Sequence, residues 1–391
     1  MPVLSLFKSN LMKKIVFLLL TVLLLFNCKK NEDTYKDIGY LRKLYAQTDT
    51  SKWPAPSLDS LIDKSEFQDI GLLPKVEYPA DNPYSKEKKE LGKFLFFDAR
   101  LSKTGQIACA SCHNPELAWT DNITRSFGHD RLTSKRNAMT IKNVAFAHTL
   151  FWDGRSSSLE HQASFPIVDP VEMNTETNIA VENISQIKAY RPLFKKAFDD
   201  DEVTLERISK AIATYERTIV SRNSKFDRFI KGKKELFTDQ EVLGLHLFRT
   251  KARCINCHNT PYFSDNQFHN DGQALFGGKN EDFGRYYFTQ NKEDLGKFKT
   301  PTLREISMTG PWMHHGHFPS LLDVVEFYNL GNPTPIQKRY LGAGRDSLIP
   351  KTSPLLKRLH LSKDEVQAVI AFMETLSTRT QRVNISKIPK S

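Results

Sequence analysis

The chain has 391 residues, of which 39% are hydrophobic and 26% are charged, and its formal net charge is +11. The length allows two domains of ordinary size, and the composition predicts a soluble, folded protein rather than a disordered one. The basic excess is spread along the chain with no arginine-rich run, so it indicates a solvated surface, and no nucleic acid partner is expected.

The N-terminus predicts export. Lys13 and Lys14 precede an apolar run at 15–26, which is too short for a comfortable membrane span and is typical of a signal peptide. The run stops just before Cys28, as in lipoproteins whose first mature residue is a lipidated cysteine. We therefore expect a signal peptide of the lipoprotein type at 1–27, a lipid anchor on Cys28 and a periplasmic location. An uncleaved anchor or a plain secretory signal is the alternative.

The next segment, 28–80, is polar and contains Trp53-Pro54-Ala55-Pro56, which is typical of a tether and an N-terminal arm. A first domain is expected at 81–235. Ser85 can cap a helix through Phe97 there. Thr204 can cap another, whose apolar residues repeat at helical spacing: Leu205, Ile208, Ile212, Tyr215 and Ile219.

The four remaining cysteines form two motifs of one spacing, Cys109-Ala-Ser-Cys112-His113 and Cys254-Ile-Asn-Cys257-His258. Two thiols can add to the vinyl groups of a porphyrin, and the adjacent histidine can then reach the iron. One such motif could also be a redox dithiol or half of a zinc site. Two copies in an exported chain, each followed by histidine, predict two covalently attached c-type haems.

The second half, 236–391, repeats features of the first. Capping boxes at 238–241 and 362–365 each predict a helix, the latter running through Leu376. The pattern L-G-x-x-L-F stands before each haem motif, at 91–96 and at 243–248, which indicates an internal duplication. Long Gly/Pro/Asn-rich loops are expected at 264–300 and 329–354, and strand patterns are scarce. The predicted fold is mainly α, with two cytochrome c-like domains that each hold one covalently bound haem and long connecting loops.

Several local patterns are specific to one family. They are Leu95-Phe96-Phe97-Asp98-x-Arg100-Leu101-Ser102, Cys109 to Pro115, Phe151-Trp152-Asp153-Gly154-Arg155, Asp169-Pro170-Val171-Glu172-Met173, Lys299-Thr300-Pro301-Thr302-Leu303-Arg304 and the stretch Pro311 to Gly316. On these residues the chain from Leu91 to Leu376 resembles the bacterial di-haem cytochrome c peroxidases and their relative MauG. The resemblance implies a peroxidatic haem in the first domain and an electron-transfer haem in the second, which face a common interface.

The resemblance also implies roles for single residues of the first domain. Glu172 matches the distal glutamate, a group that can take a proton from one peroxide oxygen and return it to the other. Gln162 matches the distal glutamine, and Trp152 matches the tryptophan between the haems. His129 matches a histidine that can sit on the distal side of the peroxidatic iron, and Arg155 is expected to pair with a haem propionate. For each residue an ordinary surface or core role is the alternative.

Further ligands follow from the same comparison. The oxygens of Asn137, Thr309 and Pro311 match positions that hold a calcium ion between the domains. Tyr328 stands where conventional peroxidases of the family have the methionine ligand of the second haem, and MauG also has tyrosine there. A phenolate favours ferric iron and higher states, whereas a thioether favours ferrous iron. In the alternative, Tyr328 only packs, and Met308, Met313 or His314 ligates instead.

The expected activity is the reduction of hydrogen peroxide to water, with electrons from a small redox protein such as a cytochrome c. A MauG-like oxidase that modifies a protein side chain is the second hypothesis, and a plain electron-transfer cytochrome is the third. Glu172 and Gln162 argue against the third, because a pure carrier needs no acid–base pair beside its iron. The resemblance allows a homodimer.

Overall fold

A computed structural model describes residues 37–331, 344–380, 382–385 and 388–390. The chain forms two compact units that divide between Pro54 and Ala55. The expected signal peptide and its cysteine, Cys28, lie outside the described residues. Within the described ranges, no helix is both long enough and apolar enough to cross a membrane.

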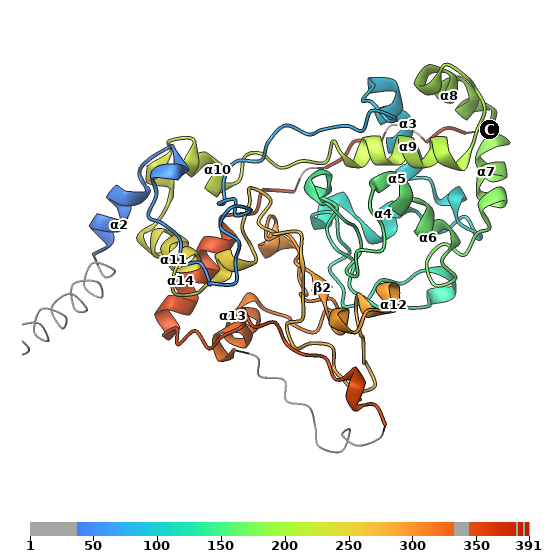
Figure 1. The fold of residues 1–391 in the computed structure, drawn as a ribbon. Helices are drawn as coiled ribbons and strands as arrows, with labels where there is room; N and C mark the ends of the chain where they lie inside the picture. The colour runs from blue at the N-terminus through green and yellow to red at the C-terminus, as the bar shows by residue number, and fades with distance from the viewer. Residues whose placement is uncertain (1–36, 332–343, 381, 386–387, 391) are drawn as a thin grey trace, which may run out of the picture. The chain divides into compact units, whose positions relative to one another are not determined.

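The described part of the chain is mainly helical, as predicted. Its α-helices and strands, drawn in Figure 1, are α2 (Ile38–Tyr45), α3 (Lys86–Phe96), α4 (Cys109–Cys112), α5 (Leu159–Gln162), α6 (Ser164–Val168), α7 (Thr177–Ser185), α8 (Arg191–Phe198), α9 (Leu205–Glu216), α10 (Lys225–Ile230), α11 (Asp239–Arg249), β1 (Phe268–His269), α12 (Tyr286–Thr289), β2 (Phe298–Lys299), α13 (Leu321–Leu330) and α14 (Lys363–Glu374). Strands β1 and β2 pair antiparallel, so the expected loop at 264–300 contains a small sheet.

The duplicated L-G-x-x-L-F pattern marks two equivalent helix crossings. Helix α3 packs against α9, and α11 packs against α14 (Figure 1). A Cβ on Gly92 would lie 1.8 Å from the Ala211 carbonyl oxygen, and a Cβ on Gly244 would lie 1.9 Å from that of Ala368. Only glycine lets the two backbones approach so closely. The repeated glycine is therefore explained by packing in both halves.

Helix starts agree with the sequence better than helix ends do. The side chains of Ser85, Thr204, Thr238 and Ser362 all cap the helices that follow them. Helix α9 ends at Glu216, so Ile219 lies beyond it, and α14 ends at Glu374, two residues before Leu376. Ile219 and Leu376 are nevertheless buried, so their apolar character reflects packing outside the helices and not a continued helix.

Each half has its own buried core. In the first, residues of α3, α7, α8 and α9 pack together around Leu91, Phe96 and Ile212. In the second, an aromatic cluster joins Phe226, Phe248, Phe263 and Phe372. Since Phe226 belongs to α10, this helix packs with the second core although it precedes residue 235. The domain boundary near 235 stays a prediction, because residues from Ala55 onward form one compact unit.

Part of the N-terminal arm lies on the second haem motif. The backbone N–H of Asp59 donates to the Asn256 side chain (2.7 Å), and Asn256 donates to the Ser57 carbonyl (3.3 Å). The buried Asp59 carboxylate pairs with Arg253 and with Lys357. Asn256 stands between the two cysteines of the second motif, so these hydrogen bonds attach the arm to that motif.

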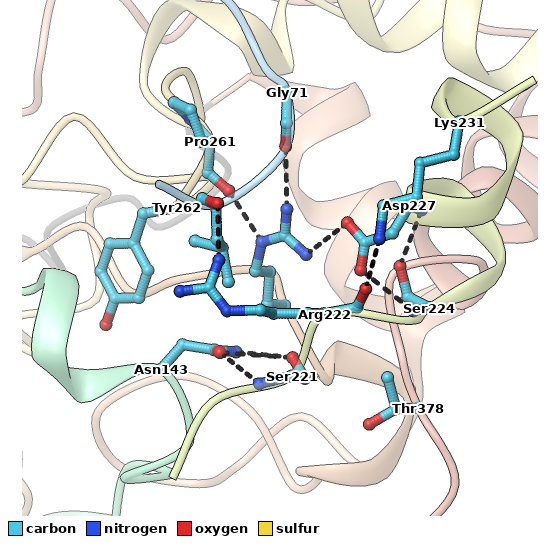
Figure 2. Close-up of polar contacts among 12 residues, drawn as sticks. Gly71, Asn143, Ser221, Arg222, Ser224, Asp227, Lys231, Pro261, Tyr262 and Thr378 are labelled. Atoms are coloured by element: carbon cyan, nitrogen blue, oxygen red, sulfur yellow. Dashed lines mark hydrogen bonds and ion pairs between the residues drawn. The ribbon is translucent and has the colours of Figure 1, made fainter. Parts of the chain in front are cut away.

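A buried guanidinium anchors the end of the arm. Arg304 donates to the carbonyl of Gly71 (2.9 Å) and to that of Pro261 (2.7 Å), and it pairs with Asp227 at 3.1 Å. Figure 2 labels Gly71, Pro261 and Asp227, the three residues that this guanidinium contacts. Arg304 and Asp227 are 0% and 1% exposed, so the pair depends on these hydrogen bonds to compensate its desolvation.

Candidate active site

The first haem motif presents its histidine in an orientation suited to a metal. Cys109 and Cys112 are the first and last residues of the short helix α4, and His113 follows. The His113 Nδ1 lies 3.2 Å from the Trp119 carbonyl oxygen. Because a carbonyl can only accept, Nδ1 carries the proton and Nε2 keeps its lone pair. Burial lowers the pKa of His113, which favours this neutral form.

The second motif repeats the arrangement. The His258 Nδ1 lies 3.1 Å from the Phe263 carbonyl oxygen, and burial again lowers the pKa of this histidine. Cys254 and Cys257 form no disulfide. Burial also raises the pKa of the Cys254 thiol to about 12. Two motifs with the same hydrogen bond from the histidine fit two haems attached through thioethers, each with one axial histidine.

A cavity of about 1050 Å³ surrounds the first motif. This volume lies at the upper end of the range for small-molecule and cofactor sites. Its lining includes every first-domain residue for which the sequence predicts a haem or catalytic role except His129: Cys109, Cys112, His113, Trp152, Arg155, Gln162 and Glu172. The cavity thus combines the attachment cysteines, the axial histidine and the expected distal groups, which is the donor set that a c-type haem requires.

Glu172 is poised for proton transfer. Burial raises the pKa of this carboxyl to about 7, the charge of Asp169 adds to the increase, and Arg155 opposes it. A group with a pKa near the operating pH can both accept and return a proton. Gln162, which lies at the end of α5, contributes a neutral amide to the same cavity.

Trp152 and Arg155 are fixed by neighbours. The Trp152 indole N–H donates to the Asn137 carbonyl (2.9 Å), and the ring packs edge-on against His314 at 6.2 Å between centroids. The Arg155 guanidinium pairs with Asp153 at 3.0 Å and stacks over Phe151. Arg155 therefore already has a carboxylate partner, and its expected bond to a haem propionate stays a prediction.

His129 does not line the cavity. Its ring Nε2 lies 3.2 Å from the Asp130 carboxylate, and its buried Nδ1 has no hydrogen-bond partner among the described residues. Its backbone N–H, however, donates to the Glu172 carbonyl (2.7 Å), and a Cβ on Gly128 would overlap the Val171 carbonyl oxygen at 2.1 Å. In this conformation the His129 loop supports the backbone of Glu172, and its role as an iron ligand stays a prediction.

Tyr328 lies near the second motif. Burial raises the pKa of its phenol well above the usual range, with further contributions from Asp271, Cys257 and Cys254. The thiols of both cysteines are thus close enough to affect the pKa of the phenol, and ligation of the second haem by Tyr328 stays a prediction. Of the alternative ligands, His314 lines the first cavity and stacks on Phe298 at 3.6 Å, whereas Met308 is exposed.

The expected calcium ligands lie on two neighbouring segments. The backbone N–H of Asn137 donates to the His314 carbonyl (2.8 Å), which joins the segment of Asn137 to the stretch after Thr309 and Pro311. The Asn137 amide nitrogen donates to the Ile123 carbonyl (2.8 Å), and the Thr309 hydroxyl lies 3.4 Å from the Ile306 carbonyl. No contact that the structure describes joins the three expected ligand oxygens.

Two cavity residues have no counterpart in the sequence predictions. Glu216 is 4% exposed, one of its oxygens has no partner among the described residues, and burial raises its pKa to about 8. Lys299 is 3% exposed and reaches the first cavity from the second half of the chain. In the sequence, Glu216 stands near the end of a predicted helix and Lys299 begins a family motif. Neither feature indicates that the charged side chain is buried.

Two haem motifs with oriented histidines, and a carboxyl poised near neutrality beside one of them, define a di-haem c-type cytochrome equipped for acid–base chemistry. Comparisons with known proteins agree. The model of the di-haem cytochrome c peroxidase family matches residues 86–235. The chain is 37% identical to the methylamine utilization protein MauG of Methylorubrum extorquens over 317 residues, which cover 80% of this chain and 85% of that protein.

Two further relatives point the same way. The cytochrome c551 peroxidase of Nitrosomonas europaea is 37% identical over 340 residues, covering 86% of this chain and 94% of that protein. The crystal structure of a MauG-like protein associated with microbial copper homeostasis has a TM-score of 0.70 and 30% identity, covering 82% of this chain and 96% of that one. The chain belongs to the di-haem cytochrome c peroxidase family, and it is an oxidoreductase of that class.

Proposed function

We propose that the chain reduces hydrogen peroxide to two waters at the haem site of Cys109, Cys112 and His113, using two electrons from a small redox protein such as a cytochrome c. The observation that carries the proposal is the Glu172 carboxyl, which lines the same cavity as this motif and has a pKa raised to about 7. An electron carrier has no use for such a group.

The residues of the cavity have distinct tasks. A haem held by Cys109, Cys112 and His113 would supply the redox chemistry, with two electrons from the donor and two protons from solvent converting the peroxide to two waters. Glu172 would take a proton from one peroxide oxygen and return it to the other, so that the second can leave as water. The Gln162 amide would donate a hydrogen bond to the peroxide. The Trp152 indole, which packs against His314, would relay electrons that arrive from the second haem site.

The decisive assay is steady-state oxidation of reduced cytochrome c by hydrogen peroxide, with the full-length haem-loaded protein. The proposal predicts peroxide-dependent turnover that Glu172→Gln strongly reduces. A plain electron-transfer cytochrome would exchange electrons with the donor at a rate that peroxide does not change.

Tyr328 supports a second candidate function, a MauG-like oxidase that uses peroxide to modify a protein side chain. Burial disfavours the phenolate, so iron would have to displace the proton of Tyr328, and the resulting anionic ligand of the second haem would stabilise oxidised iron. Tyr328→Met should then raise the potential of this haem and speed electron entry, while Tyr328→Phe should change its ferric spectrum. If the spectrum of the second haem is unchanged in Tyr328→Phe, only the peroxidase hypothesis remains.

The finer features predicted from the sequence belong to the same proposal. A calcium ion held by oxygens of Asn137, Thr309 and Pro311 would join two segments that already share a backbone hydrogen bond. Export to the periplasm, a lipid anchor on Cys28 and a homodimer are supported by the sequence and the resemblance. Membrane fractionation of a Cys28→Ala variant tests the anchor.

A further inference from the structure

Lys299 crosses from the second half of the chain to the first haem site. It lies on strand β2, and its backbone N–H donates to the Trp152 carbonyl (2.8 Å). Its ammonium donates to the Thr149 carbonyl (2.5 Å). The side chain lines the same cavity as Cys109 and Glu172. Backbone and side chain are therefore both fixed against the segment that leads into Trp152.

The ammonium is a buried charge without a carboxylate partner. Lys299 is 3% exposed and forms no ion pair with any residue that the structure describes. An ammonium has three donors, of which the Thr149 carbonyl uses one. Burial lowers the pKa of Lys299 to about 8, and Asp265 opposes the decrease, so the amine is mainly charged at pH 7. Buried charges in proteins are normally paired, because an unpaired one is costly to desolvate.

The other cations at this cavity differ from Lys299. Arg136 pairs with Asp153 and with Asp282, both at 2.7 Å, and Arg155 also pairs with Asp153. Lys135 and Lys279 are exposed, and Arg125 is partly exposed, with a buried Nε that has no partner among the described residues. Of the lysines and arginines that line this cavity, Lys299 is therefore the buried one, and it has no carboxylate partner among the described residues.

We propose that Lys299 binds a propionate carboxylate of the haem attached at Cys109 and Cys112. The inference rests on the proposed haem site and gives a role to Lys299, which the resemblance includes in a motif without assigning it one. Arg155, which already pairs with Asp153, stays a predicted partner of a propionate, and Lys299 is proposed in addition to it. The haem that is covalently bound to the first half would thereby be held by an ion pair to the second.

The ion pair has an electrostatic consequence. Reduction of ferric haem adds one negative charge to the site, and a buried ammonium nearby stabilises the reduced state. Loss of the ammonium should lower the reduction potential of the first haem. It should also raise the pKa of the unpaired propionate, so that the potential becomes more dependent on pH near neutrality.

The test is a spectroelectrochemical titration of the full-length, haem-loaded protein at several pH values. Lys299→Met and Lys299→Gln remove the charge, Lys299→Arg keeps it, and Lys135→Met removes an exposed charge at the same cavity. We expect a lower and more pH-dependent first-haem potential in the two neutral variants, and the parent value in Lys299→Arg and Lys135→Met. Resonance Raman bands of the propionates should shift in the neutral variants only.

Two results would overturn the proposal: a parent-like potential in Lys299→Met and Lys299→Gln, or an equal shift in Lys135→Met. Haem analysis of the parent chain separates this failure from failure of the proposed function. If the parent chain carries two haems and the neutral variants leave the potential unchanged, only the role of Lys299 is rejected. If the parent chain carries no haem at Cys109 and Cys112, the proposed function is rejected as well.

Discussion

Replacement of Glu172 by glutamine removes the proton-transfer group and leaves the cavity nearly unchanged in shape. Glutamine has the same size, and no hydrogen bond of the Glu172 side chain would be lost among those the structure describes. We expect the second-order rate constant for peroxide to fall by about a hundredfold or more, the scale of a positioned general acid–base. The haem spectrum should stay the same, because no ligand is replaced.

The pH dependence makes this prediction sharper. Glu172 must be ionised to accept the first proton, and its pKa is about 7. Such a group is ~10% ionised at pH 6 and ~90% ionised at pH 8, so the rate of the parent should rise through this window and then level. The Gln variant should lose this dependence. Asp169→Asn should move the rise to lower pH, because the charge of Asp169 helps to raise the pKa of Glu172.

Stopped-flow mixing with peroxide from pH 5 to 9 measures both effects. Glu182→Gln, the same change at an exposed site on α7, is the matched control and should behave like the parent. Parent-like rates in Glu172→Gln, or a rise between pH 6 and 8 that persists in this variant, would show that Glu172 is not the proton-transfer group.

Three predictions concern stability. Glu216 has a folded pKa of about 8 against an ordinary value of 4.5; the folded state therefore holds this proton more tightly, and stability should fall as pH rises from 4.5 to 8. Glu216→Gln should remove that loss, on the order of 4 kcal/mol at pH 8 and almost nothing at pH 4.5, as measured by denaturant unfolding. Asp227→Asn leaves the buried Arg304 charge uncompensated and should cost about 3–5 kcal/mol, whereas an unfolding midpoint equal to that of the parent would show that the pair is not needed. Gly244→Ala and Gly92→Ala should each lower the melting temperature by several degrees, because the added Cβ overlaps a carbonyl oxygen of the partner helix; unchanged melting would contradict the close crossing.

The predictions from sequence were strongest where a local rule decides the structure. Side-chain caps at Ser85, Thr204, Thr238 and Ser362 depend only on neighbouring residues, and all four form. Helix ends follow the sequence less closely, since the apolar spacing continues past Glu216 and Glu374 to residues that are buried outside the helices. The glycine of L-G-x-x-L-F was visible as a repeat, but its cause, a crossing helix far along the chain, was not.

At the site, family patterns identified residues that local rules could not. Gln162 and Glu172 have no periodicity that indicates function, yet both line the cavity of the first motif. The pKa values of Glu172 and Glu216 depend on burial by segments distant in sequence, so they could be learned only from the fold. A role for Lys299 could not be predicted for the same reason: nothing in the sequence shows that strand β2 of the second half reaches the first haem site.

The first haem is expected to react with peroxide and the second to deliver electrons, and removing each motif in turn tests these two roles most directly. Cys109→Ala/Cys112→Ala and Cys254→Ala/Cys257→Ala are each analysed by pyridine haemochrome assay and by reaction with peroxide. We expect one haem per chain in each variant, no peroxide reaction without the first motif, and a peroxide reaction without turnover of reduced cytochrome c when the second is absent. Two haems remaining in either variant, or full peroxidase turnover without the first motif, would contradict the account.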